Sequence, residues 1–305
     1  MLRYLVGRLI SAVITLLVVS AVVFVVARLT GDPVRLLLPI EASNEEVARV
    51  RHDLGLDQPL PLQYVTFLGQ ALHGDLGTSL RYRQPALAVI ESRLPATAYL
   101  ALAAMFVALV IAVPAGILSA ARPGGVADGI ARVVSLLGQA LPAYWLGIML
   151  IIVFAVWLRW LPAAGATSPT SVVLPAITLG LWPTARISRV LRASLIEALN
   201  ADYVRTARAK GLAEARGVLL HAIRNALLPA ITVIGLSVGL VFGGAIITET
   251  VFAWPGVGRL LLEAVSQRDY PMVQAIVLTF SGLFLLINLG VDLLYGALDP
   301  RIRLS

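Results

Sequence analysis

Five long stretches of this 305-residue sequence contain no aspartate, glutamate, lysine or arginine. A bilayer core about 30 Å thick requires roughly 20 apolar residues in a helix that rises about 1.5 Å per residue, so each stretch is long enough to cross a membrane. The stretches are Leu9 to Ala27, Leu94 to Ala121, Val133 to Leu158, Asn225 to Thr248 and Tyr270 to Val291. We therefore predict an all-α, polytopic membrane protein.

The composition supports this class and excludes others. Hydrophobic residues make up 59% of the chain, charged residues only 13%, and the mean hydropathy is +0.88. A soluble domain carries about 25% charged residues, so this chain has too little charge to cover a water-facing surface, which excludes a soluble enzyme and a disordered chain. The absence of cysteine excludes disulfide scaffolds and thiolate metal sites.

A sixth span is predicted between the third and fourth of these stretches. It begins near Val172 and runs through Ala185 before meeting three arginines, Arg186, Arg189 and Arg192. We expect this helix to continue past the membrane edge, with Arg186 and Arg189 extending toward the headgroups. Without it the chain has five spans and its termini lie on opposite sides.

The first stretch has two interpretations. Arg3 and Arg8 precede it, as in a secretory signal. Its apolar core is longer than the roughly 7–15 residues of a signal, and no clear small-x-small cleavage site precedes Gly31-Asp32-Pro33. An uncleaved first helix is favoured over a removed signal.

Basic residues flank the six spans asymmetrically. One side holds both termini, the loop from Arg122 to Arg132 and the segment 186–224, with 14 of the 24 basic residues; the short loops of the other side hold three. This contrast places both termini in the cytoplasm. The predicted parts are residues 1–27 (N-terminus and first helix), 28–93 (external cap), 94–291 (five helices with the cytoplasmic segment 186–224) and 292–305 (cytoplasmic tail).

The external stretch is predicted to form a small folded cap. Ser43-Asn44-Glu45-Glu46 fits a capping box, which begins a helix that Gly55 ends. A second amphipathic helix is predicted from Leu62 to Leu72. These helices either cover the ends of membrane helices or form a docking surface for an external partner.

The cytoplasmic segment 186–224 is longer than a helix connection requires. Eight basic and three acidic residues give it a net charge of +5. Asn200 and Asp202 favour a helix start, while Lys210 and Gly211 favour a helix end. We predict a short helix, a glycine turn and a second helix, from about Glu214, that enters the next span.

Motifs for catalysis and nucleotide binding are missing. The sequence has no Gly-x-x-x-x-Gly-Lys-Ser/Thr, His-Glu-x-x-His or Gly-x-Ser-x-Gly motif, so no catalytic residue is assigned. His52, His73 and His221 are predicted in loops on two sides of the membrane, where they cannot supply three ligands to one metal ion. Surface or capping roles are favoured for them, and no metal site is assigned.

The five stretches also lack the charged residues that proton relays and ion-coupled carriers place inside the membrane. Their polar residues either line a path or bridge helices, and the substrate path is unassigned. These residues include Gln139, Ser237, Thr279 and Asn288.

Gly235, Gly239 and Gly243 recur every four residues in the fifth span. On a helix they form a strip without side chains that lets another helix approach closely. Close packing within the subunit is the first interpretation, and a contact that slides during transport is the alternative. Gly239→Leu is expected to abolish assembly or transport.

The cytoplasmic segment and several short fragments resemble one family. Asp202-Tyr203-Val204-Arg205-Thr206-Ala207-Arg208-Ala209-Lys210-Gly211-Leu212 and the later His221-Ala222-Ile223-Arg224-Asn225-Ala226-Leu227-Leu228-Pro229 resemble the coupling loop of bacterial ATP-binding-cassette importer permeases for dipeptides, oligopeptides and nickel. The fragments include Arg93-Leu94-Pro95-Ala96-Thr97, Glu249-Thr250-Val251-Phe252, Pro255-Gly256-Val257-Gly258, Ser79-Leu80-Arg81 and Arg268-Asp269-Tyr270-Pro271. The chain departs from the general permease pattern at Arg205, where an acidic residue is usual.

The resemblance implies a six-helix type I importer permease in the bacterial inner membrane. It implies a second permease subunit, two cytoplasmic ATPases that bind ATP and Mg, and an external substrate-binding protein, with no cofactor in this subunit and no nucleic acid. The residues from Tyr203 to Leu212 are then the coupling helix. The predicted function is transport of peptides or a related small solute; a self-sufficient channel or secondary carrier is the alternative, and a membrane-embedded enzyme or a scaffold is disfavoured.

Overall fold

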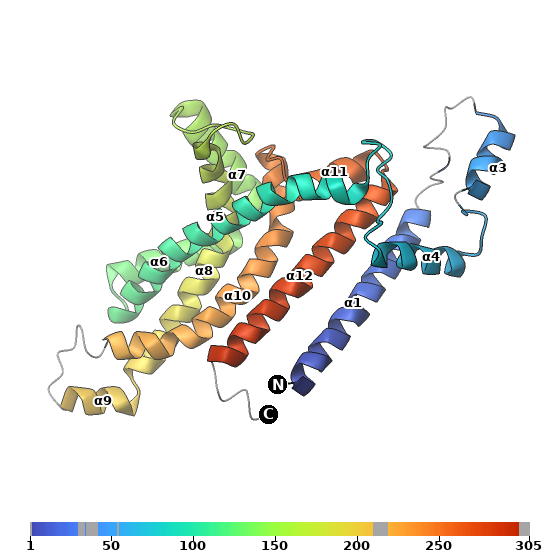
Figure 1. Cartoon of the computed structure of the whole chain (residues 1–305). Coiled ribbons are helices and arrows are strands. Elements are labelled where there is room, and N and C mark those ends of the chain that lie inside the picture. The colour runs from blue at the N-terminus through green and yellow to red at the C-terminus, as the bar shows by residue number, and fades with distance from the viewer. Residues whose placement is uncertain (1, 30–33, 35–41, 54, 210–218, 299–305) are drawn as a thin grey trace. The chain divides into compact units, whose positions relative to one another are not determined.

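The computed structural model describes residues 2–29, 34, 42–53, 55–209 and 219–298, and helices make up most of them (Figure 1). The long helices are α1 (Leu2–Leu29), α5 (Ala86–Ala121), α8 (Val173–Leu199), α10 (Leu219–Val251) and α12 (Tyr270–Leu298). The shorter ones are α3 (Asn44–Asp53), α4 (Leu60–Leu72), α6 (Val126–Ala140), α7 (Ala143–Leu150), α9 (Asp202–Ala209) and α11 (Val257–Ser266), with a π-helix at Ile151–Trp157 and a 3-10 helix at Pro169–Val172. The described residues form no strand, and the all-α prediction is confirmed.

Four of the five predicted stretches lie in helices that are long and apolar enough to cross a membrane. These candidate spans are Val6–Arg28, Ala86–Ala121, Asn225–Val251 and Tyr270–Val291. Helix α8, which holds the sixth predicted span, is not among them. It is nevertheless continuous over 27 residues, or about 40 Å at the helical rise.

The remaining stretch, from Val133 to Leu158, is not one continuous helix as expected. Helices α6 and α7 meet at an angle of 110°. Leu141, between them, is extended (φ −80°, ψ 126°), because the proline ring of Pro142 disfavours the helical conformation for the residue before it. If the bent pair counts as one span, the described residues hold five candidate spans.

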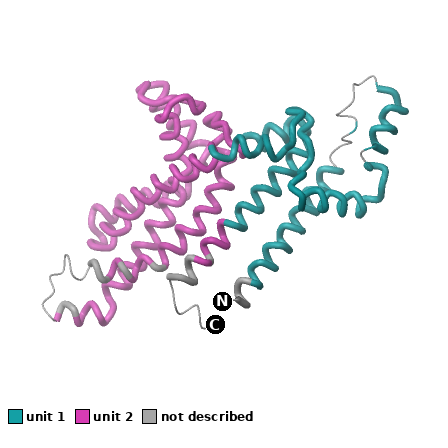
Figure 2. Tube along the Cα trace, in the orientation of Figure 1, with its two compact units in different colours: residues 1–95, 259–286 teal, residues 96–258, 287–305 magenta. Residues whose placement is uncertain are grey.

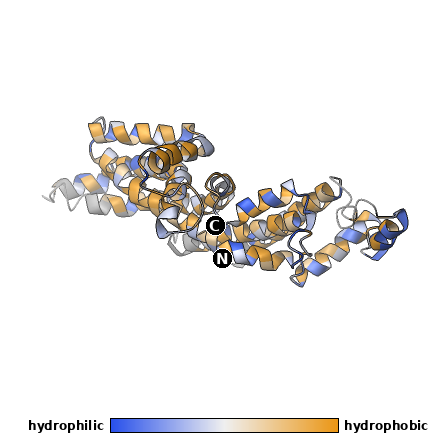
Figure 3. Cartoon of the chain, turned by 90° about the horizontal axis from the view of Figure 1, so that it is seen from above, coloured by the Kyte–Doolittle hydropathy of each residue, from blue (hydrophilic) through white to orange (hydrophobic). Residues whose placement is uncertain are grey.

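The chain divides into two compact units, shown in different colours in Figure 2. Unit 1 comprises residues 1–95 and 259–286, and unit 2 comprises residues 96–258 and 287–305. Helices α5 and α12 contribute to both units. In Figure 3, apolar residues extend along the surfaces of the helices, as expected for helices that face lipid.

In unit 1 the predicted capping box is present. The Glu46 amide donates to Ser43 Oγ (3.2 Å), and the Ser43 amide donates to Glu46 Oε2 (3.2 Å). Gly55, with φ +63°, follows helix α3 as predicted.

Helix α4 packs against α1. The Tyr64 hydroxyl donates to the Leu17 carbonyl oxygen (3.0 Å) and lies 2.7 Å from Ser20 Oγ. The Phe24 ring lies 5.4 Å from that of Tyr64 and 5.8 Å from that of Phe67. These contacts fix α4 against α1; whether the external helices cover the ends of membrane helices or form a docking surface stays a prediction.

Two histidines lie in helices, so their predicted loop locations are wrong. His221 belongs to α10, and His52 to the last turn of α3; both positions fall within helices that the sequence predicts, one from the Ser43 capping box to Gly55 and one from about Glu214 into the next span. His52 Nδ1 lies 2.7 Å from Asp57 Oδ2. The hydrogen bond and the charge of Asp57 raise the pKa of the exposed His52 ring, and the same bond lowers the pKa of Asp57.

In unit 2, helices α5, α8 and α10 pack around a core of aliphatic and small residues. This core includes Leu100, Ala104 and Ala112 of α5, Ala176, Leu179 and Ile187 of α8, and Val233, Val241 and Ala245 of α10. A Cβ atom on Gly180 would lie 2.6 Å from the Ala104 carbonyl oxygen. Small residues therefore bring the α5 and α8 backbones close together, the usual device of membrane helices.

Helix α6 buries two polar side chains and exposes several apolar ones. The buried residues are Asp128, Ser135 and Gly138, and the exposed apolar ones include Val126, Ile130, Val133 and Leu136. This is the reverse of a soluble amphipathic helix. The sequence analysis placed Asp128 and Arg132 in a loop; both lie in this helix.

Candidate functional site

The predicted coupling residues Tyr203 to Ala209 lie in α9, a helix of eight residues at the far end of α8 (Figure 1). Helix α8 ends at Leu199 and is capped by Asn200, whose side-chain amide donates to the Ile196 carbonyl oxygen (3.0 Å). The amide of Val204 donates to the Ala201 carbonyl oxygen (3.0 Å), which starts the new helix. A two-residue turn thus separates α8 from α9.

One residue anchors α9 while its neighbours face outward. Val204 is 1% exposed, whereas Tyr203 is 41% exposed. Arg205, Thr206 and Ala209 are exposed as well. A buried valine below an aromatic and polar surface is suited to a helix that is held by its own subunit and presents side chains to another protein.

Arg205 makes an ion pair with Asp202, one turn earlier in the helix. Both side chains are exposed, so the pair adds little to stability. The ion pair holds the Arg205 side chain near the first turn of α9. Lys210, Gly211 and Leu212, the rest of the predicted coupling residues, and the predicted second helix start near Glu214 lie outside the described residues.

The helices on either side of α9 are joined at their bases. A cluster of buried residues unites the end of α5, the second half of α8 and the first half of α10: Ala120, Leu191, Leu195, Ala222, Ala226 and Ala230. The alanines allow close approach, and the leucines fill the space between helices. A displacement of α9 therefore acts on a packed pair of helices rather than on a loose loop.

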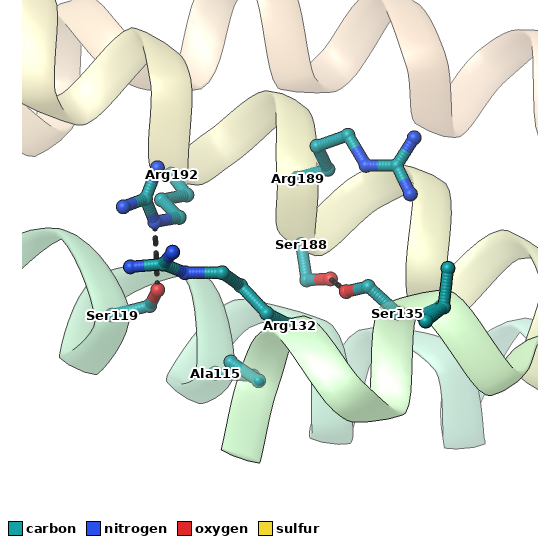
Figure 4. A pocket seen from close by; sticks show the side chains of 9 residues that line it. Ala115, Ser119, Arg132, Ser135, Ser188, Arg189 and Arg192 are labelled. Atoms are coloured by element: carbon teal, nitrogen blue, oxygen red, sulfur yellow. Dashed lines mark hydrogen bonds between the residues drawn. The ribbon is translucent and has the colours of Figure 1, made fainter. Parts of the chain in front are cut away.

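A buried aspartate fixes the same region. Asp128 of α6 is 0% exposed and makes hydrogen bonds with Arg132, Ser119 and the Gly124 amide. Arg192 of α8 approaches both of its oxygens, with Nε–Oδ1 at 2.8 Å and Nη2–Oδ2 at 3.1 Å. The cluster links the end of α5, α6 and α8; Figure 4 shows Arg192 directed toward Ser119.

An apolar cavity of about 300 Å³ lies beside the break between α6 and α7. Helices α8 and α10 complete its wall, and none of its lining residues is charged. Leu141, Leu146, Trp182, Leu240 and Ile247 contribute large apolar surfaces. Cavities of this size and lining accept small molecules or apolar side chains.

Fragments that are far apart in the sequence meet in unit 2. The carboxylate of Glu249 is 0% exposed and accepts a hydrogen bond from Thr97 (2.6 Å). Thr97 Oγ1 in turn accepts from the Val257 amide (2.9 Å), and the Trp254 indole donates to the Ala96 carbonyl oxygen (2.9 Å). This network joins α5 to the end of α10 and the start of α11.

A second meeting of fragments occurs in unit 1. Asp269, 2% exposed, accepts from Ser79 Oγ (2.5 Å) and from the amides of Leu80 (3.1 Å) and Arg81 (3.2 Å). It fixes the segment before α5 to the start of α12. In both units the buried carboxylates accept hydrogen bonds from neighbouring residues. A charged group that is removed from water requires such donors.

The glycines of the predicted strip have different surroundings. A Cβ atom on Gly235 would lie 2.5 Å from Val291 Cγ1 of α12, and one on Gly243 would have no heavy atom within 4 Å. Gly239 is buried. Gly244, beside the strip, faces Leu179 of α8. The functional role of the strip stays a prediction.

The sequence analysis missed Asp128, Arg192 and Glu249 as members of buried networks. Asp128 and Arg132 stand four positions apart, the spacing of an ion pair on one helix face, and this signal was available. No local pattern links Arg192 to Asp128 or Glu249 to Thr97. Their contacts join different helices and follow from packing.

Comparisons with known proteins agree with this architecture. Residues 112–304 match the family described as "Binding-protein-dependent transport system inner membrane component", and residues 1–101 match the corresponding N-terminal family. Relatives named "Glutathione transport system permease protein GsiC" come from Pectobacterium atrosepticum (45% identical), Escherichia coli K12 (44%) and Shigella flexneri serotype 5b (44%). Each alignment extends over 304 residues and covers 99% of both chains.

Both families together extend over nearly the whole chain, and the relatives match it from end to end. The candidate membrane spans fit a multi-pass protein of the inner membrane. The chain therefore belongs to the binding-protein-dependent transport family, as a permease of the peptide type of ATP-binding-cassette importers in the bacterial inner membrane.

Proposed function

We propose that this chain forms the translocation path of an ATP-driven importer for peptides or a related small solute and has six spans with both termini in the cytoplasm. The sixth span is α8. Most of its first half is buried or half-buried, including Leu174, Leu179 and Ala185, and its arginines begin only at Arg186. The ring of Trp182 lies 5.6 Å from the Arg186 guanidinium, an arrangement suited to a membrane interface.

The observation that carries the proposal is the placement of α9. It is short, buries Val204, exposes Tyr203, Arg205, Thr206 and Ala209, and is followed in sequence by α10, which packs on α8. A partner that binds α9 acts directly on two of the proposed spans. ATP-driven movement of that partner then biases the permease between two arrangements of its helices.

The proposed partners are a second permease subunit, two cytoplasmic ATPases and an external substrate-binding protein. ATP and Mg bind to the ATPases, and this subunit holds no cofactor. The family description and the names of the relatives support such an assembly. Lipid surrounds the exposed apolar faces of the helices.

The proposed solute is a small peptide, and glutathione is the first to test because relatives that match 99% of the chain are named for its transport. The apolar cavity beside the α6–α7 break is compatible with transient passage. Its lack of charged residues avoids strong retention of a charged peptide.

Uptake by reconstituted vesicles tests the proposal. The complex with its ATPases and binding protein is expected to accumulate radiolabelled glutathione or dipeptide when ATP is supplied on the ATPase side. Gly211→Pro is expected to leave the permease inserted while ATP hydrolysis continues without uptake, because the proline disturbs the end of the coupling helix. Ala164→Pro, in an exposed irregular segment, is the control and should retain uptake. Normal uptake by the Gly211 variant would remove the assignment of the coupling helix.

The alternative is a channel or secondary carrier that works alone. The permease reconstituted without partners is expected to accumulate nothing uphill. Uphill accumulation by vesicles that contain this chain alone would overturn the proposed dependence on ATPases.

A further inference from the structure

A second cavity, of about 370 Å³, lies between α5, α6 and α8 (Figure 4). Three arginines line it, Arg132 of α6 and Arg189 and Arg192 of α8. Two buried hydroxyl groups, those of Ser135 and Ser188, lie 3.1 Å apart between the arginines. Its volume falls in the range of about 300–1,000 Å³ that is typical of small-molecule sites.

The cavity carries an excess of positive charge. Asp128 forms ion pairs with Arg132 and Arg192 and thereby offsets one positive charge. None of the residues that line the cavity is acidic. Arg189 is exposed and forms no ion pair with any other residue that the structure describes. Two arginine charges therefore remain for an anion.

The mouth of the cavity borders an apolar surface. Leu136 lines the cavity and is 66% exposed, and Val133 beside it is 56% exposed. Ile130 continues this surface along α6 and is 61% exposed. Exposed aliphatic side chains on a membrane protein are suited to contact with acyl chains, while long arginine side chains reach the headgroup level.

We propose that this cavity binds the phosphate of an anionic phospholipid, with the acyl chains against the outer face of α6. Guanidinium groups hold phosphate oxygens through paired, charge-assisted hydrogen bonds, and the serine hydroxyls, which bond to each other and to the Ala185 carbonyl oxygen, give the cavity a polar lining. A basic pocket between membrane helices is suited to such a headgroup. The proposal that the bound lipid lies in the inner leaflet rests on the orientation given under the proposed function. The proposal that the cavity binds a lipid phosphate does not depend on that orientation.

The test is lipid binding to the purified transporter complex in a neutral detergent, where no membrane surface potential acts. Native mass spectrometry and thermal unfolding are followed during titration with phosphatidylglycerol. Arg189→Gln is expected to weaken binding about tenfold, in line with loss of a hydrogen bond between charged groups. Arg189→Lys keeps the charge and should restore most of the binding.

Arg186→Gln is the matched control. It removes the same charge from the same helix three positions earlier, but Arg186 stacks on Trp182 and does not line the cavity. Its binding is expected to stay within about twofold of wild type. Equal losses in both glutamine variants, or wild-type binding by Arg189→Gln, would overturn the proposal.

The ligand class has its own controls. Phosphatidylcholine, which has no net charge, should bind more weakly than phosphatidylglycerol, and inorganic phosphate should not stabilise the complex at the same concentration. Equal binding of phosphatidylcholine would contradict selection of an anionic lipid. Equal stabilisation by inorganic phosphate would show a site for free anions instead.

A protein partner is distinguished by cross-linking. The chain has no cysteine, so Leu136→Cys introduces a single reactive thiol at the mouth of the cavity. In membranes this thiol should form no cross-link to other subunits, because acyl chains rather than protein lie against it. A specific cross-link to a second permease subunit would show that protein covers the cavity and would refute lipid binding there.

Discussion

Buried carboxylates are the residues whose environment is most demanding in this protein. Asp128, Glu249 and Asp269 are each at most 2% exposed. A charge removed from water requires donors or a counter-ion, and each of these groups has at least one hydrogen-bond donor from a different element. The three residues therefore hold separate elements of the fold in place.

Thr97→Val tests this at Glu249. The substitution keeps the shape of the side chain but removes the donor to the carboxylate and the acceptor for the Val257 amide. Leaving these buried groups with fewer partners is expected to cost about 1–3 kcal/mol, which appears as a lower thermal midpoint of the purified complex.

Thr250→Val is the control for that measurement. Its hydroxyl is exposed and bonds only the Ile246 carbonyl oxygen of its own helix (2.7 Å). The loss should stay within about 0.5 kcal/mol. Equal effects of the two substitutions would show that the Glu249 network does not contribute to stability.

At the scale of elements, Gly180 is the site of the closest approach between the α5 and α8 backbones that the glycines show. Gly180→Ala would place a Cβ atom 2.6 Å from the Ala104 carbonyl oxygen, and a backbone atom cannot move aside as a side chain can. Overpacking of this kind is expected to destabilise the complex by about 1–3 kcal/mol. Gly290→Ala, with no heavy atom within 4 Å, should be neutral or slightly stabilising in the same thermal unfolding assay.

Local elements of the fold were predictable from the sequence, and long-range contacts were not. Ser43 and Glu46 form the predicted capping box because their interaction involves residues three positions apart. Pro142 carried enough information to predict the break before α7, through its effect on Leu141. The Asp128–Arg192 contact joins residues 64 positions apart, and no periodic pattern determines such a pair.

In the candidate site, too, the local helix was predictable from the sequence and its long-range packing was not. The sequence identified the coupling residues up to Ala209 as a separate short helix, because the cap signals at Asn200 and Asp202 are local. The sequence did not show that Val204 is the residue that anchors this helix. Burial of Val204 depends on the packing of α9 in unit 2, which hydrophobic periodicity over eight residues cannot resolve.

At the scale of the whole molecule, the proposed function requires that force applied to α9 reaches the proposed spans. Leu191 and Leu195 of α8 are fully buried and pack in one cluster with the alanines of α10. A densely packed contact transmits displacement, whereas a loosened contact absorbs it. The base of α8 and α10 is therefore the place where coupling efficiency is most sensitive to packing.

Leu195→Ala is the corresponding prediction. Removal of the buried side chain leaves a cavity that costs about 2–5 kcal/mol and loosens the contact of α8 with α10. We expect the complex to assemble and hydrolyse ATP while uptake per ATP falls several-fold in reconstituted vesicles. Leu286→Ala, which removes the same atoms from a side chain that is 67% exposed, should keep the wild-type ratio. A wild-type ratio in Leu195→Ala, together with a lowered thermal midpoint, would mean that the movement of α9 reaches the transport path by a route other than this contact.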